Sequence, residues 1–322
     1  MNFWTALPRP FTALAPMEDV TDTVFRRLVA DVGAPDVFFT EFIRARELFH
    51  TRNKYAKQRI RFDPGELKTP LVAQIWGIEP DMFLKAAALI KDMGYSGVDI
   101  NMGCPEQKIT KGGACSALIN TPSLARELIL AAREGAGTLP VSVKTRLGFK
   151  KKITEEWVGF LLSQELPALT LHGRIAAQMS EGPAEWDEIA LGVNLRDQMG
   201  KPTIILGNGD LFSTQDLILK QKSSGVEGLM VGRGIFKDPY IFRKDEPHRS
   251  FLEAPAVEKI SLMAKHVKLH QEVWGDAKGY DILKKFFKIY TLGFEGDLEL
   301  RDKLMQTHSH GESLSLLREW KC

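Results

Sequence analysis

The sequence predicts a (β/α)8 TIM barrel followed by a small all-helical domain, and three observations carry this prediction. Short apolar, β-branched runs alternate eight times with longer amphipathic stretches over about the first three-quarters of the chain. Nearly every one of these runs ends in a polar or glycine cluster. After Phe242 the alternation stops, and helical patterns separated by glycines follow. We therefore expect a barrel domain over residues 1–243 and a helical domain over residues 244–322.

The candidate strands read as continuous apolar runs, as expected for parallel strands that are buried on both faces. A doubly wound open sheet is the alternative, but Ala15–Asp19 does not resemble the glycine-rich turn that usually follows its first strand. The expected strands are Thr12–Pro16, Val37–Glu41, Leu71–Trp76, Val98–Asn101, Val141–Lys144, Ala168–Leu171, Thr203–Leu206 and Leu229–Val231. The expected helices include Asp81–Met93, Ser123–Glu134, Thr214–Lys222, Ala254–Trp274, Asp281–Thr291 and Leu298–Thr307.

The composition is that of an ordinary globular protein, with 44% hydrophobic and 26% charged residues among 322. No apolar run approaches the roughly 18 residues that a membrane span needs. The three cysteines are too few for a disulfide framework and lack paired metal-ligand spacing. We expect a cytoplasmic protein without membrane or metal partners, in which any basic surface is local because the net charge is only +2.

The polar clusters at the strand ends predict one shared site, because all eight carboxyl ends of a barrel meet on one face. Polar residues in otherwise buried strands need such a reason. The clusters are Pro16-Met17-Glu18, Thr40-Glu41, Gln74, Asn101-Met102-Gly103-Cys104, Lys144-Thr145-Arg146, His172-Gly173-Arg174, Gly207-Asn208-Gly209-Asp210 and Gly232-Arg233-Gly234.

Glycines after the last two strands predict a phosphate site, since barrels commonly bind phosphate there through backbone N–H groups. The simpler alternative is that these glycines only make tight turns. Gln74, Lys144 and His172 offer an amide, a cation and an imidazole to one polar heterocycle. Singly, Lys144 is as well explained by an ion pair and His172 by a core position, but with the glycines they favour flavin mononucleotide (FMN).

Several further motifs follow one another along the chain. They are Leu14–Asp22, Asp99–Pro105, Val143–Gly148, His172–Arg174, Gly207–Asp210 and Val231–Gly234 with Pro239–Phe242. In this order they resemble the tRNA-dihydrouridine synthase family. The resemblance implies an FMN-bound TIM barrel, a helical C-terminal domain that binds RNA, NADPH as the source of electrons and tRNA as the substrate.

The resemblance also implies residue roles in reducing a uridine to 5,6-dihydrouridine. Hydride passes from reduced FMN to uracil C6, and Cys104 donates the proton to C5. An unperturbed thiol with a pKa near 8.5 is mostly protonated at neutral pH and can act as this acid. The flavin ring would lie against Pro16, Met17 and Glu18, its edge would bond Gln74, Lys144 and His172, and its phosphate would be held by Asn208, Gly209, Asp210, Gly232 and Arg233.

Substrate contacts are expected from Asn101, which precedes Cys104 by three residues, and from Arg146 and Arg174. Asn101 could equally be a turn residue at a strand end. Basic clusters predict RNA contacts, although each cluster alone is more often a solvated face. The clusters are Arg44, Arg46 and Arg52 with the basic residues up to Arg61, then Lys150–Lys152, and Lys284, Lys285 and Lys288, which are interleaved with Phe286, Phe287 and Tyr290.

The chain departs from the family pattern at Ile175–Ala177, where further polar residues are usual, at Ile235, and at Cys115, where a small residue is common. We interpret Cys115 as a small buried hydrophobe, or as a thiol open to oxidation.

Other functions remain open. They are a ribosomal RNA uridine reductase, an FMN-dependent dehydrogenase of a free pyrimidine, a phosphate-binding isomerase barrel, and an RNA-binding protein without catalysis. The free-pyrimidine enzymes usually have asparagine where Glu106 follows Cys104-Pro105.

Overall fold

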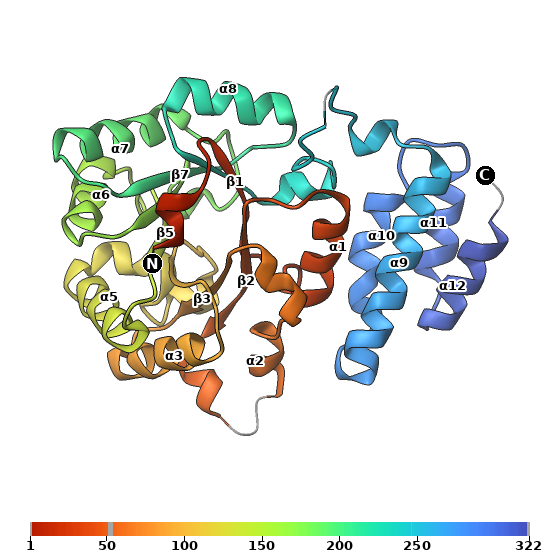
Figure 1. Cartoon of the computed structure of the whole chain (residues 1–322), viewed down its shortest axis with the longest axis horizontal. Coiled ribbons are helices and arrows are strands. Elements are labelled where there is room, and N and C mark those ends of the chain that lie inside the picture. Colours follow the sequence, from red (N-terminus) through yellow and green to blue (C-terminus); the bar gives the residue numbers. More distant parts are fainter. Residues whose placement is uncertain (1, 51–53, 246, 321–322) are drawn as a thin grey trace. The chain divides into compact units, whose positions relative to one another are not determined.

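The computed structural model describes residues 2–50, 54–245 and 247–320, and its parallel strands close into an eight-stranded barrel in sequence order. Helices follow the strands and cover the outside of the barrel (Figure 1). The predicted (β/α)8 fold with C-terminal helices is therefore confirmed. The strands are β1 (Phe11–Leu14), β2 (Val37–Arg44), β3 (Leu71–Trp76), β4 (Gly97–Met102), β5 (Val141–Arg146), β6 (Ala168–His172), β7 (Ile204–Asn208) and β8 (Gly228–Val231).

The strand bounds differ most from prediction in β2, which continues three residues beyond Glu41 to Arg44. Its register with β3 shifts between Phe39 and Phe42, an irregularity that no sequence pattern had indicated. The barrel helices are α1 (Thr23–Gly33), α2 (Lys54–Arg59), α3 (Pro80–Asp92), α4 (Gln107–Thr110), α5 (Pro122–Ala136), α6 (Thr154–Ser163), α7 (Trp186–Gln198) and α8 (Thr214–Ser224).

The barrel interior is packed with apolar side chains near the amino ends of the strands. Trp4, from the short helix η1 (Phe3–Ala6), is 1% exposed and lies with its ring centroid 6.0 Å from that of Phe11 and 6.4 Å from that of Phe39. Gly228 leaves room for this packing, since a Cβ atom there would lie 2.5 Å from the Phe11 ring. Apolar filling at this end leaves the opposite end for polar chemistry.

The chain forms two compact units that are not simple halves of the sequence. The first contains residues 1–22, 35–211 and 215–232, and the second contains 23–34, 212–214 and 233–322. Helix α1 thus belongs with the C-terminal helices α9 (Ala256–Trp274), α10 (Lys284–Tyr290), α11 (Asp297–Met305) and α12 (His310–Glu319). The predicted boundary between residues 243 and 244 stays a prediction.

Aromatic packing within the second unit explains why α1 groups with the later helices. The Phe25 ring of α1 stacks on Phe286 of α10 with 5.2 Å between centroids, and His266 of α9 lies 4.9 Å from Phe286. The predicted helix at 281–291 is divided here into a 3-10 turn, η9 (Tyr280–Leu283), and α10. Among the helices in the described part of the chain, none combines the length and apolar character that a membrane crossing requires.

Candidate functional site

Asn101, near the end of β4, holds the turn that carries Cys104. Its side-chain oxygen accepts hydrogen bonds from the backbone N–H groups of Gly103 (3.0 Å) and Cys104 (2.9 Å). Its side-chain nitrogen donates to Oε1 of Gln74 on β3 (2.9 Å). Asn101 therefore fixes the position of Cys104, a function that fits the turn interpretation as well as the substrate interpretation.

Gln74 and Asp99 form a fully buried polar pair across β3 and β4. Nε2 of Gln74 donates to Oδ2 of Asp99 (2.7 Å), and the hydroxyl of Ser142 on β5 donates to Oδ1 (2.6 Å). Burial raises the pKa of Asp99 to about 6, against the opposing effect of these two hydrogen bonds and of nearby Lys144. Gln74 lies inside β3 rather than at its end, and its amide is already engaged at both atoms.

Lys144, on β5, pairs in register with Asn101 on β4, so the lysine and the Cys104 turn come to the same end of the barrel. Its ammonium group donates to Oδ1 of Asn208 on β7 (2.9 Å). Burial lowers the pKa of Lys144 to about 8, helped by Arg146 and opposed by Asp99 and Cys104. This lysine remains a cation at neutral pH, and no carboxylate bonds it directly among the described contacts.

Cys104 and Cys115 are hydrogen-bonded to one another. This bond is the largest influence on Cys104 and lowers its pKa to about 7, although burial opposes the shift. Cys115 is buried, as predicted, and burial raises its pKa well above the usual value. The assumption of an ordinary thiol at Cys104 was wrong, because the sequence did not show that Cys115 donates to it.

Pro16, Met17 and Glu18 follow β1 and form a turn that is held from both sides. The backbone N–H of Met17 donates to the Thr21 hydroxyl (2.9 Å), and Arg59 of α2 forms an ion pair with Glu18 (2.5 Å). Pro16 and Met17 are partly buried, while Glu18 is exposed. The turn therefore presents a proline and a methionine as its apolar surface.

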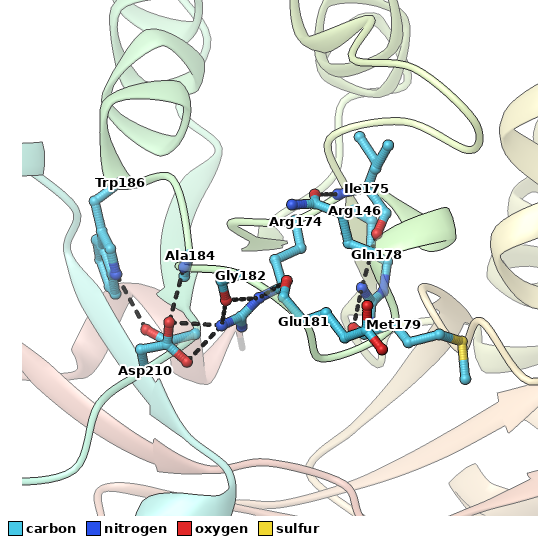
Figure 2. A network of polar contacts seen from close by, with 11 residues as sticks. Arg146, Arg174, Ile175, Gln178, Met179, Glu181, Gly182, Ala184, Trp186 and Asp210 are labelled. Carbon is cyan, nitrogen blue, oxygen red and sulfur yellow. Dashed lines mark hydrogen bonds and ion pairs between the residues drawn. The ribbon is translucent and has the colours of Figure 1, made fainter.

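Arg146, at the end of β5, binds backbone carbonyls instead of extending into solvent. It donates to the carbonyls of Gly103 (2.7 Å), Ile175 (3.0 Å) and Met179 (2.8 Å). Figure 2 shows this arginine beside the loop that follows β6. The loop at Ile175–Ala177 is thus anchored through its backbone despite its departure from the family pattern.

Arg174 and Asp210 form an ion pair that joins the loops after β6 and β7 (Figure 2). The Arg174 side chain is 3% exposed, and its guanidinium lies 2.6 Å from Oδ2 of Asp210 and also donates to the Gly182 carbonyl (2.6 Å). Asp210 accepts a further bond from the N–H of Ala184 (2.8 Å). Both side chains are engaged in holding these loops, so their predicted substrate and phosphate contacts stay predictions.

The two glycine turns follow β7 and β8. Gly209 has a φ of +124°, and a Cβ atom there would lie 2.7 Å from the Cβ of Ala184, so only glycine fits without rearrangement. Asn208 donates to the Met230 carbonyl (2.7 Å), which joins the ends of β7 and β8. Gly232 follows β8 directly, while Arg233 is exposed and begins η6 (Arg233–Phe236) in the second unit.

His172 ends β6, where the sheet register places it beside Arg146 of β5 and Asn208 of β7. Its side chain is partly exposed. The predicted amide, cation and imidazole thus lie on β3, β5 and β6 of one barrel, and Asn208 on β7 bonds the cation.

The predicted RNA-binding arginines Arg44 and Arg46 both bond Oε1 of Glu79, at 3.2 and 3.3 Å. Arg44 also lies over the Trp76 ring, 5.6 Å from its centroid. Arg52 falls outside the described residues. One carboxylate therefore serves two arginines, and Glu47 adds a second negative charge beside them.

The lysines of α10 are more exposed than its aromatic residues, although the Lys285 ammonium lies over the Phe286 ring, 5.3 Å from its centroid. Lys285 and Lys288 are exposed, whereas Lys284 is partly buried and pairs with Asp281 (2.8 Å). Phe286 and Phe287 are at most 4% exposed. The aromatic residues that interleave the lysines in the sequence therefore belong to the core and are not available for stacking on bases.

Sequence reasoning missed three participants of this site, namely Asp99, Ser142 and Arg59. An acidic residue inside an apolar strand was a usable signal for Asp99, since such a residue needs partners. Arg59 was seen only as part of a basic run. Among the side chains that the structure describes, no group of three or more histidine, cysteine or acidic residues is placed to hold a metal ion.

Comparison with known proteins identifies the family. The family model for dihydrouridine synthase matches residues 13–321. "Probable tRNA-dihydrouridine synthase 2" of Bacillus subtilis (strain 168) is 42% identical over 324 residues, covering 99% of this chain and 97% of that protein. "Probable tRNA-dihydrouridine synthase" of Staphylococcus aureus (strain COL) is 40% identical, covering 99% and 96%.

Solved structures share the fold at low sequence identity. A 6-hydroxypseudooxynicotine amine oxidase from Pseudomonas geniculata N1 has a TM-score of 0.55 at 12% identity, covering 84% of this chain and 54% of that one. Histamine dehydrogenase from Rhizobium sp. 4-9 has a TM-score of 0.54 at 12% identity, covering 80% and 48%. These likenesses concern the fold alone. The match over nearly the whole length and the 40–42% identity to curated relatives place this chain in the dihydrouridine synthase family.

Proposed function

We propose that this protein reduces a uridine in tRNA to 5,6-dihydrouridine, with FMN as the hydride carrier and NADPH as the reductant. Family membership supports the reaction class, and the names of the two relatives support tRNA as the substrate. The observation that carries the proposal is that a partly exposed thiol, Cys104, follows β4 while a partly buried cation, Lys144, lies on the neighbouring β5 at the same polar barrel end.

The side chains at this end suit an FMN molecule. Lys144 offers a cation to the edge of the flavin ring where negative charge develops on reduction, and the second N–H of Gln74 Nε2 can donate beside it. Gly209 leaves the backbone at the end of β7 without a side chain, so that its N–H group can be offered to a phosphate there. Bound and reduced FMN supplies a hydride to C6 of the uracil ring.

Other predicted flavin contacts complete this binding site in the proposal. Pro16 and Met17 would supply the surface against which the ring lies, and His172 would bond its edge. The backbone of Gly209 and Gly232 would hold the phosphate with Asn208 nearby, and Arg233 would add a charge. Glu18 and the Asp210 carboxylate act indirectly, through the ion pairs with Arg59 and Arg174.

Cys104 donates the proton to C5 of uracil in this proposal. The hydrogen bonds from its own N–H and that of Gly103 to Asn101 hold the thiol at a fixed place. With a pKa lowered to about 7, the thiol is protonated in about half of the molecules at neutral pH. Lys144 and Arg146 lie close enough to influence its charge and to stabilise the enolate that precedes protonation.

The RNA contacts in the proposal come from exposed basic groups. Arg44 ends β2 and is partly buried, Arg46 follows it and is exposed, and Lys150 and Lys151 line an open pocket of about 560 Å³ with Phe149 beyond β5. On the helical unit, Lys285 and Lys288 extend into solvent, and Lys284 lies one turn from Lys288. Contacts to the tRNA phosphates offset the few kcal/mol needed to lift a uridine out of its stack.

The test is to purify the protein, record its absorption spectrum, and assay it with NADPH on unmodified tRNA, on ribosomal RNA and on free uracil. We expect a flavin spectrum that NADPH bleaches, and dihydrouridine in tRNA alone. Nucleoside analysis of tRNA from a deletion strain should show the loss of one dihydrouridine. A flavoprotein that reduces only the free pyrimidine, or only ribosomal RNA, would replace the proposed substrate. A colourless protein without bound flavin would overturn the proposal.

A further inference from the structure

Two thiols that the sequence separates by eleven positions lie together beside the barrel end. Cys104 follows β4, and Cys115 begins the 3-10 helix η4 (Cys115–Asn120). The N–H of Ser116 donates to the Cys104 carbonyl (3.2 Å), which fixes the two backbone segments against each other. The thiols share a hydrogen bond. The two thiols therefore lie next to one another, and a backbone hydrogen bond joins the segments that carry them.

The backbone at Cys115 is not one that a cysteine adopts readily. Its φ is +53°, in the left-handed region where a residue with a Cβ atom costs about 1–2 kcal/mol. The residue is also 0% exposed, so it makes no contact with solvent. Glycine would fit this backbone with less strain. The chain thus has a cysteine where its backbone conformation is strained, and the thiol of this cysteine is hydrogen-bonded to Cys104.

The two thiols differ in the way that disulfide chemistry requires. Cys104 is partly exposed, and the bond from Cys115 together with Arg146 favours its thiolate, while burial and Glu18 oppose it. Cys115 is enclosed and stays protonated, because burial, Cys104 and Glu18 all disfavour its thiolate. Lys144 interacts electrostatically with Cys104 as a further positive charge. An exposed thiolate beside a protected thiol is the arrangement in which the first is oxidised and the second resolves it.

We propose that Cys104 and Cys115 form a peroxide-sensitive dithiol that closes reversibly to a disulfide. The Cys104 thiolate attacks one oxygen of a hydroperoxide, the O–O bond breaks, and a sulfenic acid and hydroxide form. The sulfur of Cys115 then attacks the sulfenic sulfur. The S–S bond forms, and the leaving hydroxide takes up the Cys115 proton as water. The two thiols lose two electrons in total, and the peroxide gains them.

The disulfide removes the proton that Cys104 holds and so stops the reduction of uridine until a dithiol restores both thiols. The formation of the bond needs only the two cysteines. The loss of turnover rests in addition on the proposed function of Cys104 as proton donor. The two consequences are therefore measured separately.

The experiment uses full-length Cys322→Ser protein with bound flavin, so that only Cys104 and Cys115 carry thiols. After treatment with hydrogen peroxide, trypsin should release residues 92–108 and 112–126 as one disulfide-linked species. Turnover on tRNA should fall with the yield of this species and return after dithiothreitol. If the two peptides stay separate while the thiols are consumed, the proposal is overturned.

The matched control is Cys115→Gly in the same background. Glycine suits the left-handed backbone, so this variant should keep its turnover before oxidation at a pH below the Cys104 pKa of about 7, where the thiol is mostly protonated with or without Cys115. Under peroxide it should lose turnover without recovery in dithiothreitol, because the Cys104 sulfenic acid has no partner and oxidises further. Full recovery of the glycine variant would overturn the proposal. A linked species that retains full turnover would support the dithiol and reject Cys104 as the proton donor.

Discussion

The polar end of the barrel and helix α10 use polar side chains in opposite ways. At the barrel end, Gln74 and Asp99 are fully buried and Asn101 is 6% exposed, and each of them bonds another member of the group. On α10, the buried positions are aromatic, while Lys285 and Lys288 lie in water. The buried polar side chains at the barrel end destabilise the fold unless every one of them has a hydrogen-bond partner, because a buried polar group without a partner is destabilising.

This difference predicts how each region should respond to amino-acid substitutions. Side chains of the barrel end act as a unit, so the loss of one affects its neighbours, and effects of paired substitutions should not add. Exposed lysines act as separate charges, so their effects should be small and nearly additive. The following substitutions test this contrast.

The largest effect is expected for Cys104→Ala. Loss of a general acid typically slows a reaction by about 10²–10⁴-fold, and the alanine variant should bind flavin and be reduced by NADPH as before. Stopped-flow absorbance would follow flavin reduction, and nucleoside analysis would follow dihydrouridine. Unchanged turnover on tRNA would remove the thiol from the mechanism.

A smaller but clear effect is expected on stability for Arg174→Met. It leaves the Asp210 carboxylate without its ion-pair partner, and breaking a largely buried pair costs about 3 kcal/mol. Urea unfolding would measure this loss in the single variants and in the double variant with Asp210→Asn. We expect the double variant to lose less than the sum of the two singles. Strict additivity would show that the loops after β6 and β7 are held independently.

The pH dependence of turnover is expected to report the thiol pair. A proton donor is competent only below its pKa, so turnover under saturating conditions should decline about tenfold per unit as the pH rises above about 7. Cys115→Gly removes the hydrogen bond that lowers this pKa, which should move the decline to higher pH. Iodoacetamide alkylation of Cys104 should show the same displacement. An identical midpoint in both proteins would mean that Cys115 does not influence Cys104.

The smallest effects are expected on α10, for Lys285→Ala and Lys288→Ala. Each should weaken tRNA binding by a few-fold and reduce the slope of log affinity against log salt by about 1. The double variant should show the sum of the two effects. Filter binding at several salt concentrations would measure this. A salt slope equal to that of the unchanged protein would place the RNA elsewhere.

The fold was largely predictable because each parallel barrel strand has a clear sequence pattern, namely an apolar run followed by polar residues. All eight strand starts were predicted to within one residue because such runs are bounded by glycine and polar residues, whereas the irregular extension of β2 has no local pattern. Helix α12 was not predicted, since its mixed sequence carries a weak apolar stripe. Residue types and order therefore determine the scaffold well.

The site was predictable in its membership but not in its connections. Lys144, Asn208 and Cys104 were expected at one barrel end, and the structure brings them there. The bonds of Arg146 and Arg174 to loop carbonyls depend on the paths of those loops, which no residue pattern reveals. The same is true of the bond from Cys115 to Cys104. Long-range partners of polar groups are a property of tertiary structure.

The placement of α1 with the C-terminal helices bears on any attempt to divide this protein. Phe25 contacts the rings of His266 and Phe286, which both lie far beyond position 243 in the sequence. A fragment that ends at residue 243 would carry α1 with its apolar side uncovered, which favours aggregation. Exchange of the helical unit between relatives would likewise have to include residues 23–34. A single cut by limited proteolysis or gene truncation therefore cannot separate the two units, because residues 23–34 and 212–214 belong with residues 233–322.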